Sequence, residues 1–337
     1  MALFDLPLDA LRDYSPEPTA APDFDDFWST TVAQARQHDL QATFVPYDNR
    51  LAVIDTYDVT FAGFGGTPVR GWLHVPVGAV GPLPTVVQYH GYSAGRGMAF
   101  SSTLFADAGY AHLVMDTRGQ GWAGGGVTGT PDATVEAGEL HAPGFMTVGL
   151  DDPYRYYYRR VFTDAVRALE AAAAHPLVDA TRIAVTGGSQ GGGISLAAAG
   201  LAREVGIELV GCAPDVPFLC HFERALALTD AHPYGEIVTF LAGWRDRAAA
   251  AYRTLSYVDA MNLARRASAP ALFSVALMDQ ICPPSTVFAA FNLYGSLAAP
   301  EIAKRIEVYP HNGHEGGGDY QRAVALDWFA ELFGATS

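Results

Sequence analysis

The chain is short of positive charge, of cysteine and of long apolar runs, and each shortage excludes a class of protein. It has 21 Lys and Arg against 36 Asp and Glu, a formal net charge of −15 at pH 7. Nucleic acids and anionic membrane surfaces bind basic proteins through electrostatic attraction to their phosphates. We therefore expect neither nucleic acid nor a membrane as a partner.

Cysteine is scarce, with only Cys212, Cys220 and Cys282 in the chain and no Cys-x-x-Cys pair among them. An odd number at wide spacing does not make a disulfide framework and suits a reducing compartment. The segment from Met1 to Pro7 has neither a basic region nor a sustained apolar run, so we expect no signal peptide. No stretch is long and apolar enough to span a bilayer. Together these features predict a cytoplasmic location.

What the sequence does have is a repeated alternation of short apolar strands with helical segments. At 337 residues and 50% hydrophobic content, it can bury a large core. Such alternation is typical of an α/β protein with a doubly wound, mainly parallel sheet. The predicted strands cover 51–61, 69–75, 85–89, 111–115, 182–185, 208–213, 271–277 and 305–309. The predicted helices cover 24–38, 100–108, 153–175, 194–199, 284–294 and 320–333.

We expect one domain over residues 1–337, because no linker divides the chain. Three segments lie outside the alternation: an N-terminal extension (1–50), a loop excursion (121–152) and an aromatic-rich helical insertion (217–257). Loops as long as the excursion are usually functional. A Gly-x-Gly-x-x-Gly run begins there at Gly124, but a proline follows it in place of a helix. We therefore expect no dinucleotide and no other cofactor.

One strand-to-helix turn has the clearest chemical signal. Ser189 stands between Gly187 and Gly191 in a Gly-x-Ser-x-Gly motif, with a predicted strand before it and a predicted helix after it. That context is typical of a nucleophile elbow. The glycines let strand and helix approach closely, while the strained turn exposes the hydroxyl. The amide of Gln190, at the helix N-terminus, can then donate to a developing oxyanion.

A serine nucleophile needs a general base, and that base needs an acceptor that fixes its tautomer. In hydrolases with this elbow the acid and then the histidine follow the serine along the chain. Asp279 comes just after the strand 271–277, and His314 lies in a glycine-flanked loop after the last strand. We predict Asp279 as the acid and His314 as the base. Asp215, at another strand end, and His311 are the rivals.

Further residues are assigned to the same edge of the sheet, where ligands of such folds bind. The second oxyanion donor is expected just after the strand 85–89, and the backbone amide of Tyr92 fits that place. Arg118 ends the neighbouring strand, where we expect an ion pair and not chemistry. Glu315 either braces the histidine loop or is a solvated charge. The loop has no His-Glu-x-x-His and no second cluster, so no metal is expected.

These motifs together strongly resemble carbohydrate esterase family seven, the acetyl xylan esterase and cephalosporin C deacetylase family. The resemblance is carried by Arg118-Gly119-Gln120, by the elbow from Gly187 to Gly192, and by His314-Glu315. It covers nearly the whole chain. Further similar stretches are Pro143 to Met146, Tyr156 to Phe162, Asp215 to Cys220 and Met278 to Phe288.

The resemblance implies an α/β-hydrolase serine esterase that removes acetyl groups from xylo-oligosaccharides and cephalosporins. It gives Ser189, Asp279 and His314 as the triad, with the amides of Tyr92 and Gln190 as the oxyanion hole. It also implies an intracellular enzyme, usually a homohexamer whose active sites face an inner cavity. The expected partners are small acetylated substrates and other copies of the chain.

Arg118, Gln120 and Glu315, which belong to these motifs, are predicted as supporting residues.

Two other functions can be weighed against the esterase. Prolyl-oligopeptidase-like peptidases share a Gly-Gly-Ser-x-Gly-Gly elbow, but they usually have a large β-propeller, and the segment before the strand 85–89 is too short for one. A catalytically inactive hydrolase fold used for binding would not need a serine, an aspartate and a histidine in this order. The esterase therefore explains more of the sequence.

Overall fold

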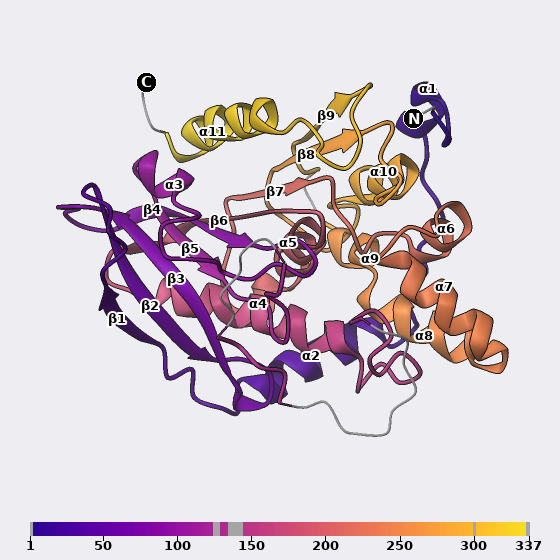
Figure 1. The fold of residues 1–337 in the computed structure, drawn as a ribbon, viewed down its shortest axis with the longest axis horizontal. Helices are drawn as coiled ribbons and strands as arrows, with labels where there is room; N and C mark the ends of the chain where they lie inside the picture. Colours follow the sequence, from indigo (N-terminus) through magenta and orange to yellow (C-terminus); the bar gives the residue numbers. More distant parts are fainter. Residues whose placement is uncertain (1–2, 124–128, 134–143, 299–300, 335–337) are drawn as a thin grey trace.

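A nine-stranded sheet runs through the computed structural model, which describes residues 3–123, 129–133, 144–298 and 301–334 (Figure 1). The strand order is β1-β2-β3-β5-β4-β6-β7-β8-β9. Neighbours from β5 to β9 are parallel, whereas β1, β2 and β3 pair antiparallel. The strands are β1 (Thr43–Tyr47), β2 (Ile54–Ala62), β3 (Pro68–Pro76), β4 (Leu83–Tyr89), β5 (Ala111–Met115), β6 (Val178–Gly188), β7 (Gly211–Asp215), β8 (Ala271–Ala276) and β9 (Lys304–Tyr309).

Helices cover both faces of this sheet, as the alternating pattern predicts. Helices α2, α4 and α5 lie on one side in Figure 1, and α11 lies on the other. The helices are α1 (Leu8–Arg12), α2 (Phe24–Ala35), α3 (Leu104–Asp107), α4 (Tyr157–Ala173), α5 (Gln190–Leu201), α6 (Phe222–Leu228), α7 (Tyr234–Gly243), α8 (Ala248–Val258), α9 (Ala260–Ala264), α10 (Pro284–Leu293) and α11 (Asp319–Phe333). Three 3₁₀ turns are Phe64–Gly66, Ala202–Val205 and Arg245–Arg247.

Apolar side chains form a separate core on each face of the sheet. The larger cluster includes the inward faces of α4 and α5, which are buried along nearly their whole length. The smaller cluster lies under α11, where Trp328, Phe329 and Phe333 meet Phe105 and Tyr110. Burial of apolar area on both faces holds the parallel strands in register. It thereby fixes their carboxyl ends, from which the candidate site is built.

The N-terminal extension runs across the helical insertion and α10. The carboxylate of Asp5 accepts hydrogen bonds from Arg224 of α6 and from the amide of Ser285 of α10. The hydroxyl of Tyr14 bonds the ring of His221, just before α6. The extension also adds β1 to the sheet. Helices α6, α7 and α8 make up the predicted insertion, at the right of Figure 1.

The structure differs from the sequence-based assignment at several places, among them the short helices α1 and α9, which lie outside the predicted helices. Strand β1 was not predicted, because its mostly exposed side chains do not alternate with buried ones. Capping rules predict Asp23 before α2 and Asp319 before α11 as N-caps. Asp23 stands at the N-cap position of α2, but its carboxylate accepts a hydrogen bond from the hydroxyl of Tyr257 and makes no capping bond. Asp319 is the first residue of α11, and Gly318 takes the cap position. None of the helices in the described residues has the length and apolarity needed to cross a membrane.

Candidate active site

The turn between β6 and α5 places Ser189 in a backbone conformation that non-glycine residues rarely adopt. Its φ and ψ are 55° and −119°. Main-chain hydrogen bonds hold it there: its amide donates to the carbonyl of Asp215 at 2.9 Å, and its carbonyl accepts from the amide of Phe218 at 2.9 Å. A Cβ on Gly191 would lie 2.2 Å from the carbonyl oxygen of Tyr89, so this close approach requires glycine. Such strain, held by its surroundings, is typical of a nucleophile elbow.

The structure brings the three predicted catalytic side chains into one hydrogen-bonded chain. His314 Nε2 lies 3.0 Å from Ser189 Oγ, and His314 Nδ1 lies 2.8 Å from Asp279 Oδ2. The other carboxylate oxygen of Asp279 accepts from the amides of Ile281 and Cys282, at 2.8 and 3.0 Å. Asp279 is fully buried, whereas the His314 side chain is 29% exposed. This geometry lets a proton pass from the serine to the imidazole while the carboxylate holds the ring.

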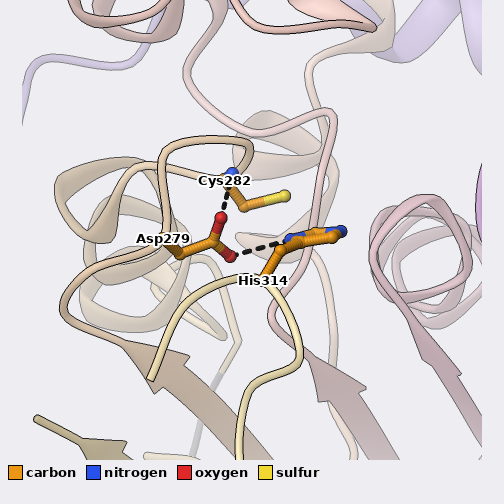
Figure 2. Close-up of side chains that lie close together, drawn as sticks. All are labelled: Asp279, Cys282 and His314. Carbon is orange, nitrogen blue, oxygen red and sulfur yellow. Dashed lines mark hydrogen bonds and ion pairs between the residues drawn. The ribbon is translucent and has the colours of Figure 1, made fainter. Parts of the chain in front are cut away.

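A cysteine thiol packs beside this chain. Among the described residues, Asp279, Cys282 and His314 are grouped closely enough to be considered as metal ligands, with donor atoms within 4.8 Å of one another (Figure 2). The acid and the imidazole already share a hydrogen bond, however. Burial raises the pKa of Cys282 well above its usual value, so its sulfur keeps a proton that a metal would have to displace. The donor set therefore fits an acid–base pair better than a metal site.

The rivals to the acid and the base lie elsewhere. Asp215 supports the elbow through its carbonyl, and its carboxylate accepts a hydrogen bond from the hydroxyl of Ser274. Burial raises the pKa of this carboxyl. In the described structure its hydrogen bonds do not include His314. His311 is exposed and is not among the described residues that line the pocket of Ser189.

The two predicted oxyanion residues flank Ser189. Gln190 is the first residue of α5, where backbone amides lack intrahelical partners. The segment that holds Tyr92 passes beside the elbow, since a Cβ on Gly91 would lie 4.0 Å from the Cβ of Ser189. Tyr92 also lines the same pocket as Ser189, so the two segments that would supply the oxyanion donors both adjoin the nucleophile.

Two buried glutamines connect these oxyanion residues. The side-chain amides of Gln120 and Gln190 pair reciprocally, with N–O distances of 2.8 and 3.2 Å. Gln120 also accepts from the amide of Ser93 at 2.7 Å, and Gln190 also donates to the carbonyl of His90 at 3.2 Å. The pair therefore holds the backbone on both sides of Tyr92. These contacts are consistent with the supporting role predicted for Gln120, which stays a prediction.

Arg118 and Glu315, predicted as supporting residues, do not line the described pocket. Arg118 is fully buried and binds Asp164 with two nitrogens, at 2.6 and 2.7 Å, and Asp132 with a third at 3.3 Å. The expected ion pair is thus present. Glu315 is exposed, and its carboxylate accepts from Asn312 and from the amide of Gly313 within the histidine loop. Hydrogen bonds from the loop's backbone and from Asn312 lower the pKa of Glu315. Of the two alternatives left open, bracing of the loop fits these contacts.

The catalytic atoms open into a cavity of about 590 Å³ with a largely apolar lining. Its residues are Gly91, Tyr92, Ser93, Trp122, Gly144, Phe145, Ser189, His232, Pro233, Glu236, Ile281 and His314. A second cavity of about 710 Å³ lies behind the elbow and reaches Gly188 and Asp215, but its lining includes neither Ser189 nor His314. We therefore take the first cavity as the candidate substrate pocket.

The pocket includes residues that sequence reasoning did not assign. His232, Pro233 and Glu236 lie at the start of α7, in the middle of the helical insertion. Gly144 and Phe145 come from the loop excursion, whose residues 124–128 and 134–143 lie outside the described part. One signal was available for Glu236. It is the only charged residue in the otherwise apolar segment 234–243, and an isolated charge in such a helix often has a buried partner.

The chain is similar to known acetyl xylan esterases over nearly its whole length. The family model described as acetyl xylan esterase (AXE1) matches residues 1–332. A solved structure of an acetyl xylan esterase from Paenibacillus sp. R4 superposes with a TM-score of 0.88 at 40% identity, covering 97% of this chain and 99% of that one. Acetyl xylan esterase 1 from Thermoanaerobacterium sp. JW/SL YS485 gives 0.86 at 31% identity, covering 98% and 100%.

More distant comparisons agree on the fold. The acetyl esterase Axe7A of Xylanibacter ruminicola is 27% identical over 331 residues, and the match spans 90% of this chain but 65% of that protein. An acylaminoacyl peptidase from Pyrococcus horikoshii gives a TM-score of 0.61 at 17% identity, covering 86% of this chain and 43% of that one. Together with the nine-stranded, mostly parallel sheet of the described residues, these likenesses confirm the α/β-hydrolase fold.

Proposed function

This chain belongs to the acetyl xylan esterase (AXE1) family, carbohydrate esterase family seven, as its motifs predict, and we propose that it hydrolyses acetyl esters of xylo-oligosaccharides and cephalosporins. The observation that carries the proposal is that His314 is hydrogen-bonded to both Ser189 and Asp279, and that Ser189 and His314 line one pocket. Each member follows a different strand of the sheet, so the rigid core sets their mutual distances. The names of the relatives in the family support the choice of acetyl as the acyl group.

In the first half of the reaction, Ser189 Oγ attacks the acetyl carbonyl while its proton moves to His314 Nε2. The resulting imidazolium is stabilised by Asp279, whose second oxygen is held by two backbone amides. The oxyanion accepts hydrogen bonds from the amides of Gln190 and Tyr92. His314 then gives the proton to the leaving alcohol oxygen. The products are a free sugar or cephem alcohol and an acetyl-serine.

In the second half, water takes the place of the alcohol. His314 removes a proton from the water, the hydroxide oxygen adds to the acetyl-serine carbonyl, and the same two amides hold the oxyanion. Return of the proton to Ser189 Oγ releases acetate. The partly exposed His314 ring lies at the pocket, so water and alcohols can both reach its Nε2.

We expect acyl-chain length to separate this esterase from less selective ones. Tyr92, Phe145 and Ile281 are bulky walls of the pocket beside Ser189. Methylenes that do not fit must displace these packed side chains, at a cost of about 1–3 kcal/mol. That corresponds to a fall of roughly 5- to 160-fold in kcat/KM between p-nitrophenyl acetate and the butyrate, with the octanoate nearly inert. Equal rates on acetate and octanoate would contradict the proposal.

The type of bond that is cleaved, an ester or an amide, distinguishes an esterase from a peptidase. Release of acetate from cephalosporin C and from acetylated xylo-oligosaccharides is the experiment that tests the proposed function directly. Both should react, because they share the acetyl ester that Ser189 attacks and differ only in the alcohol that leaves. A prolyl amide serves as the matched peptidase substrate and should stay intact. Clear cleavage of the amide would favour the peptidase, which shares the fold.

We also propose that the enzyme is a closed homohexamer in the cytoplasm, the assembly implied by the family resemblance. Exposed apolar side chains include Val45 of the edge strand β1 at 59% exposure, Val53 just before β2 at 65% and Val80 between β3 and β4 at 95%. Edge strands with apolar exposure are usually covered by a partner. The three cysteines are free and buried, which suits a reducing compartment.

Light scattering measures this assembly. We expect a mass six times the 35.9 kDa of one chain at micromolar concentration. A monomer mass would reject the hexamer. If the active sites face an inner cavity, acetylated xylo-oligosaccharides should also react much faster than the acetylated polymer at equal acetyl concentration, and equal rates would reject the cavity.

A further inference from the structure

We propose that Glu236 of α7 is a positioning residue for the oxyanion hole, acting through the side chain of Tyr92. The inference rests on the proposed function, because it assigns to Tyr92 the backbone amide that binds the oxyanion. Sequence reasoning did not single out Glu236. It is 5% exposed and lines the same pocket as Ser189 and His314.

The carboxylate of Glu236 holds the hydroxyl of Tyr92 from one side. Tyr92 Oη donates to it, at 2.7 Å from Oε1 and 2.9 Å from Oε2. The same hydroxyl accepts a hydrogen bond from the amide of Phe145 at 2.7 Å. Its single proton and one of its acceptor sites are therefore both used. Burial raises the pKa of Tyr92, which keeps the hydroxyl neutral and able to donate.

Glu236 also holds the loop that closes the pocket. Its Oε2 accepts from the amide of Met146 at 3.0 Å. A Cβ on Gly144 would lie 2.1 Å from the Glu236 carboxyl carbon, and Gly144 has a φ of 113°, so the backbone packs directly on the carboxylate. One acidic group thus joins the helical insertion, the end of the loop excursion and Tyr92.

The aromatic ring of Tyr92 is rigid, so holding its hydroxyl in place also restrains the Tyr92 backbone at the other end of the side chain. Phe145 and Phe218 meet the Tyr92 ring edge to face, with centroids 6.0 and 6.5 Å away. The backbone on either side of Tyr92 is already held by Gln190 and Gln120. Glu236 supplies the third point of support. With all three in place, the Tyr92 amide is directed before the oxyanion forms, which is how preorganised donors lower a barrier.

The contacts require a carboxylate and not merely a polar group. Both oxygens of Glu236 accept hydrogen bonds, and the pattern gives this side chain no proton to donate. In Glu236→Gln the new NH₂ group replaces one of these oxygens. At the Oε2 position it would face the amide of Met146, a second donor, and at the Oε1 position it can no longer accept from the hydroxyl of Tyr92 at 2.7 Å, which leaves that hydroxyl only the longer contact with Oε2. The substitution keeps the size of the side chain, so it tests the hydrogen bonds and not the packing.

The test is a double-mutant cycle between Tyr92→Phe and Glu236→Gln, assayed with p-nitrophenyl acetate. Loss of one oxyanion donor lowers kcat by about 10²–10³-fold, and a displaced donor loses part of that, so we expect each single variant to lower kcat by roughly 10–100-fold. KM should change by less than about threefold, because ground-state binding does not use the oxyanion contact. The kcat of the double variant should be no lower than that of the less active single variant, since both changes break the same hydrogen bond.

A second readout separates positioning from general damage to the fold. A methyl trifluoromethyl ketone forms a tetrahedral adduct with the nucleophile, so its Ki should rise by the same factor by which kcat falls. Glu223→Gln is the matched control: it makes the same chemical change at an exposed residue of α6, in the same insertion, and should leave kcat, KM and Ki unchanged.

Several outcomes would overturn the inference. They are an unchanged kcat in Tyr92→Phe, multiplying effects in the double variant, or a loss confined to KM. If Glu236→Gln does not fold, Tyr92→Phe alone decides, because it removes only the hydroxyl at the far end of the ring from the amide. An inactive wild-type enzyme on acetyl esters would instead refute the proposed function. An active wild type with unaffected variants refutes only the role of Glu236.

Discussion

Replacing Ser189 by alanine should lower kcat on acetyl esters by about 10⁶-fold, the largest effect that we expect from any single change. Without its hydroxyl, no acetyl-enzyme can form. The remaining rate over water would come from the oxyanion hole and from binding. The neighbouring thiol of Cys282 should not take over as nucleophile, because burial raises its pKa and keeps it protonated. The thermal midpoint should stay within about a degree of the wild type.

A fluorophosphonate probe gives the matched measurement. It should label the wild-type chain at the peptide that contains Ser189 and leave Ser189→Ala unlabelled. Ser195 is the control. It lies on α5, the helix that begins directly after Ser189, but its hydroxyl is buried and donates to the carbonyl of Gly191. Ser195→Ala should therefore keep both labelling and activity. Substantial turnover by Ser189→Ala, or labelling at another residue, would refute the assignment of the nucleophile.

The sequence was sufficient for the parts of the site that depend on chain order and local backbone. The glycines around Ser189 predict a close strand–helix turn, and the structure has that turn. Asp279 and His314 each follow a strand of a parallel sheet, whose carboxyl ends share one edge, so their meeting could be inferred without coordinates. The family motifs gave the same three residues. Chain order could not exclude Asp215, which also ends a strand at this edge.

The parts that could not be predicted depend on contacts between distant segments. The carboxylate of Glu236 meets Tyr92, 144 positions away in the sequence, and no local pattern encodes that pairing. The same holds for Asp23, which a local rule takes as a helix cap but which is bonded to Tyr257 across the structure. Strand β1 lacks the alternation that marks a strand because its side chains are mostly exposed at the edge of the sheet. For Asp23, a tertiary contact overrides the local signal. For Glu236 and β1, no local signal exists, and contacts between distant segments determine the structure.

The hydrogen bonds of Asp279 also fix what its amide variant should do. Its Oδ1 accepts from the amides of Ile281 and Cys282, so in Asp279→Asn the side-chain oxygen is held at that position. The new NH₂ group then points at Nδ1 of His314, where Oδ2 accepted before. A donor there requires Nδ1 to be unprotonated and places the proton of the neutral ring on Nε2. In that tautomer His314 cannot accept the proton of Ser189.

We therefore expect Asp279→Asn to fold normally and to lose about 10⁴-fold in kcat. Asp215→Asn is the matched control, being the same change at a buried carboxylate on the same edge of the sheet. The Asn oxygen there can still accept from the hydroxyl of Ser274, and the support of the elbow comes from the Asp215 carbonyl, which the change leaves intact. Its kcat should fall by less than about tenfold, because one neutral hydrogen bond is kept in place of a charged one. If Asp215→Asn were the inactive variant and Asp279→Asn the active one, the acid would be Asp215, and the bond between Asp279 and His314 would have no part in catalysis.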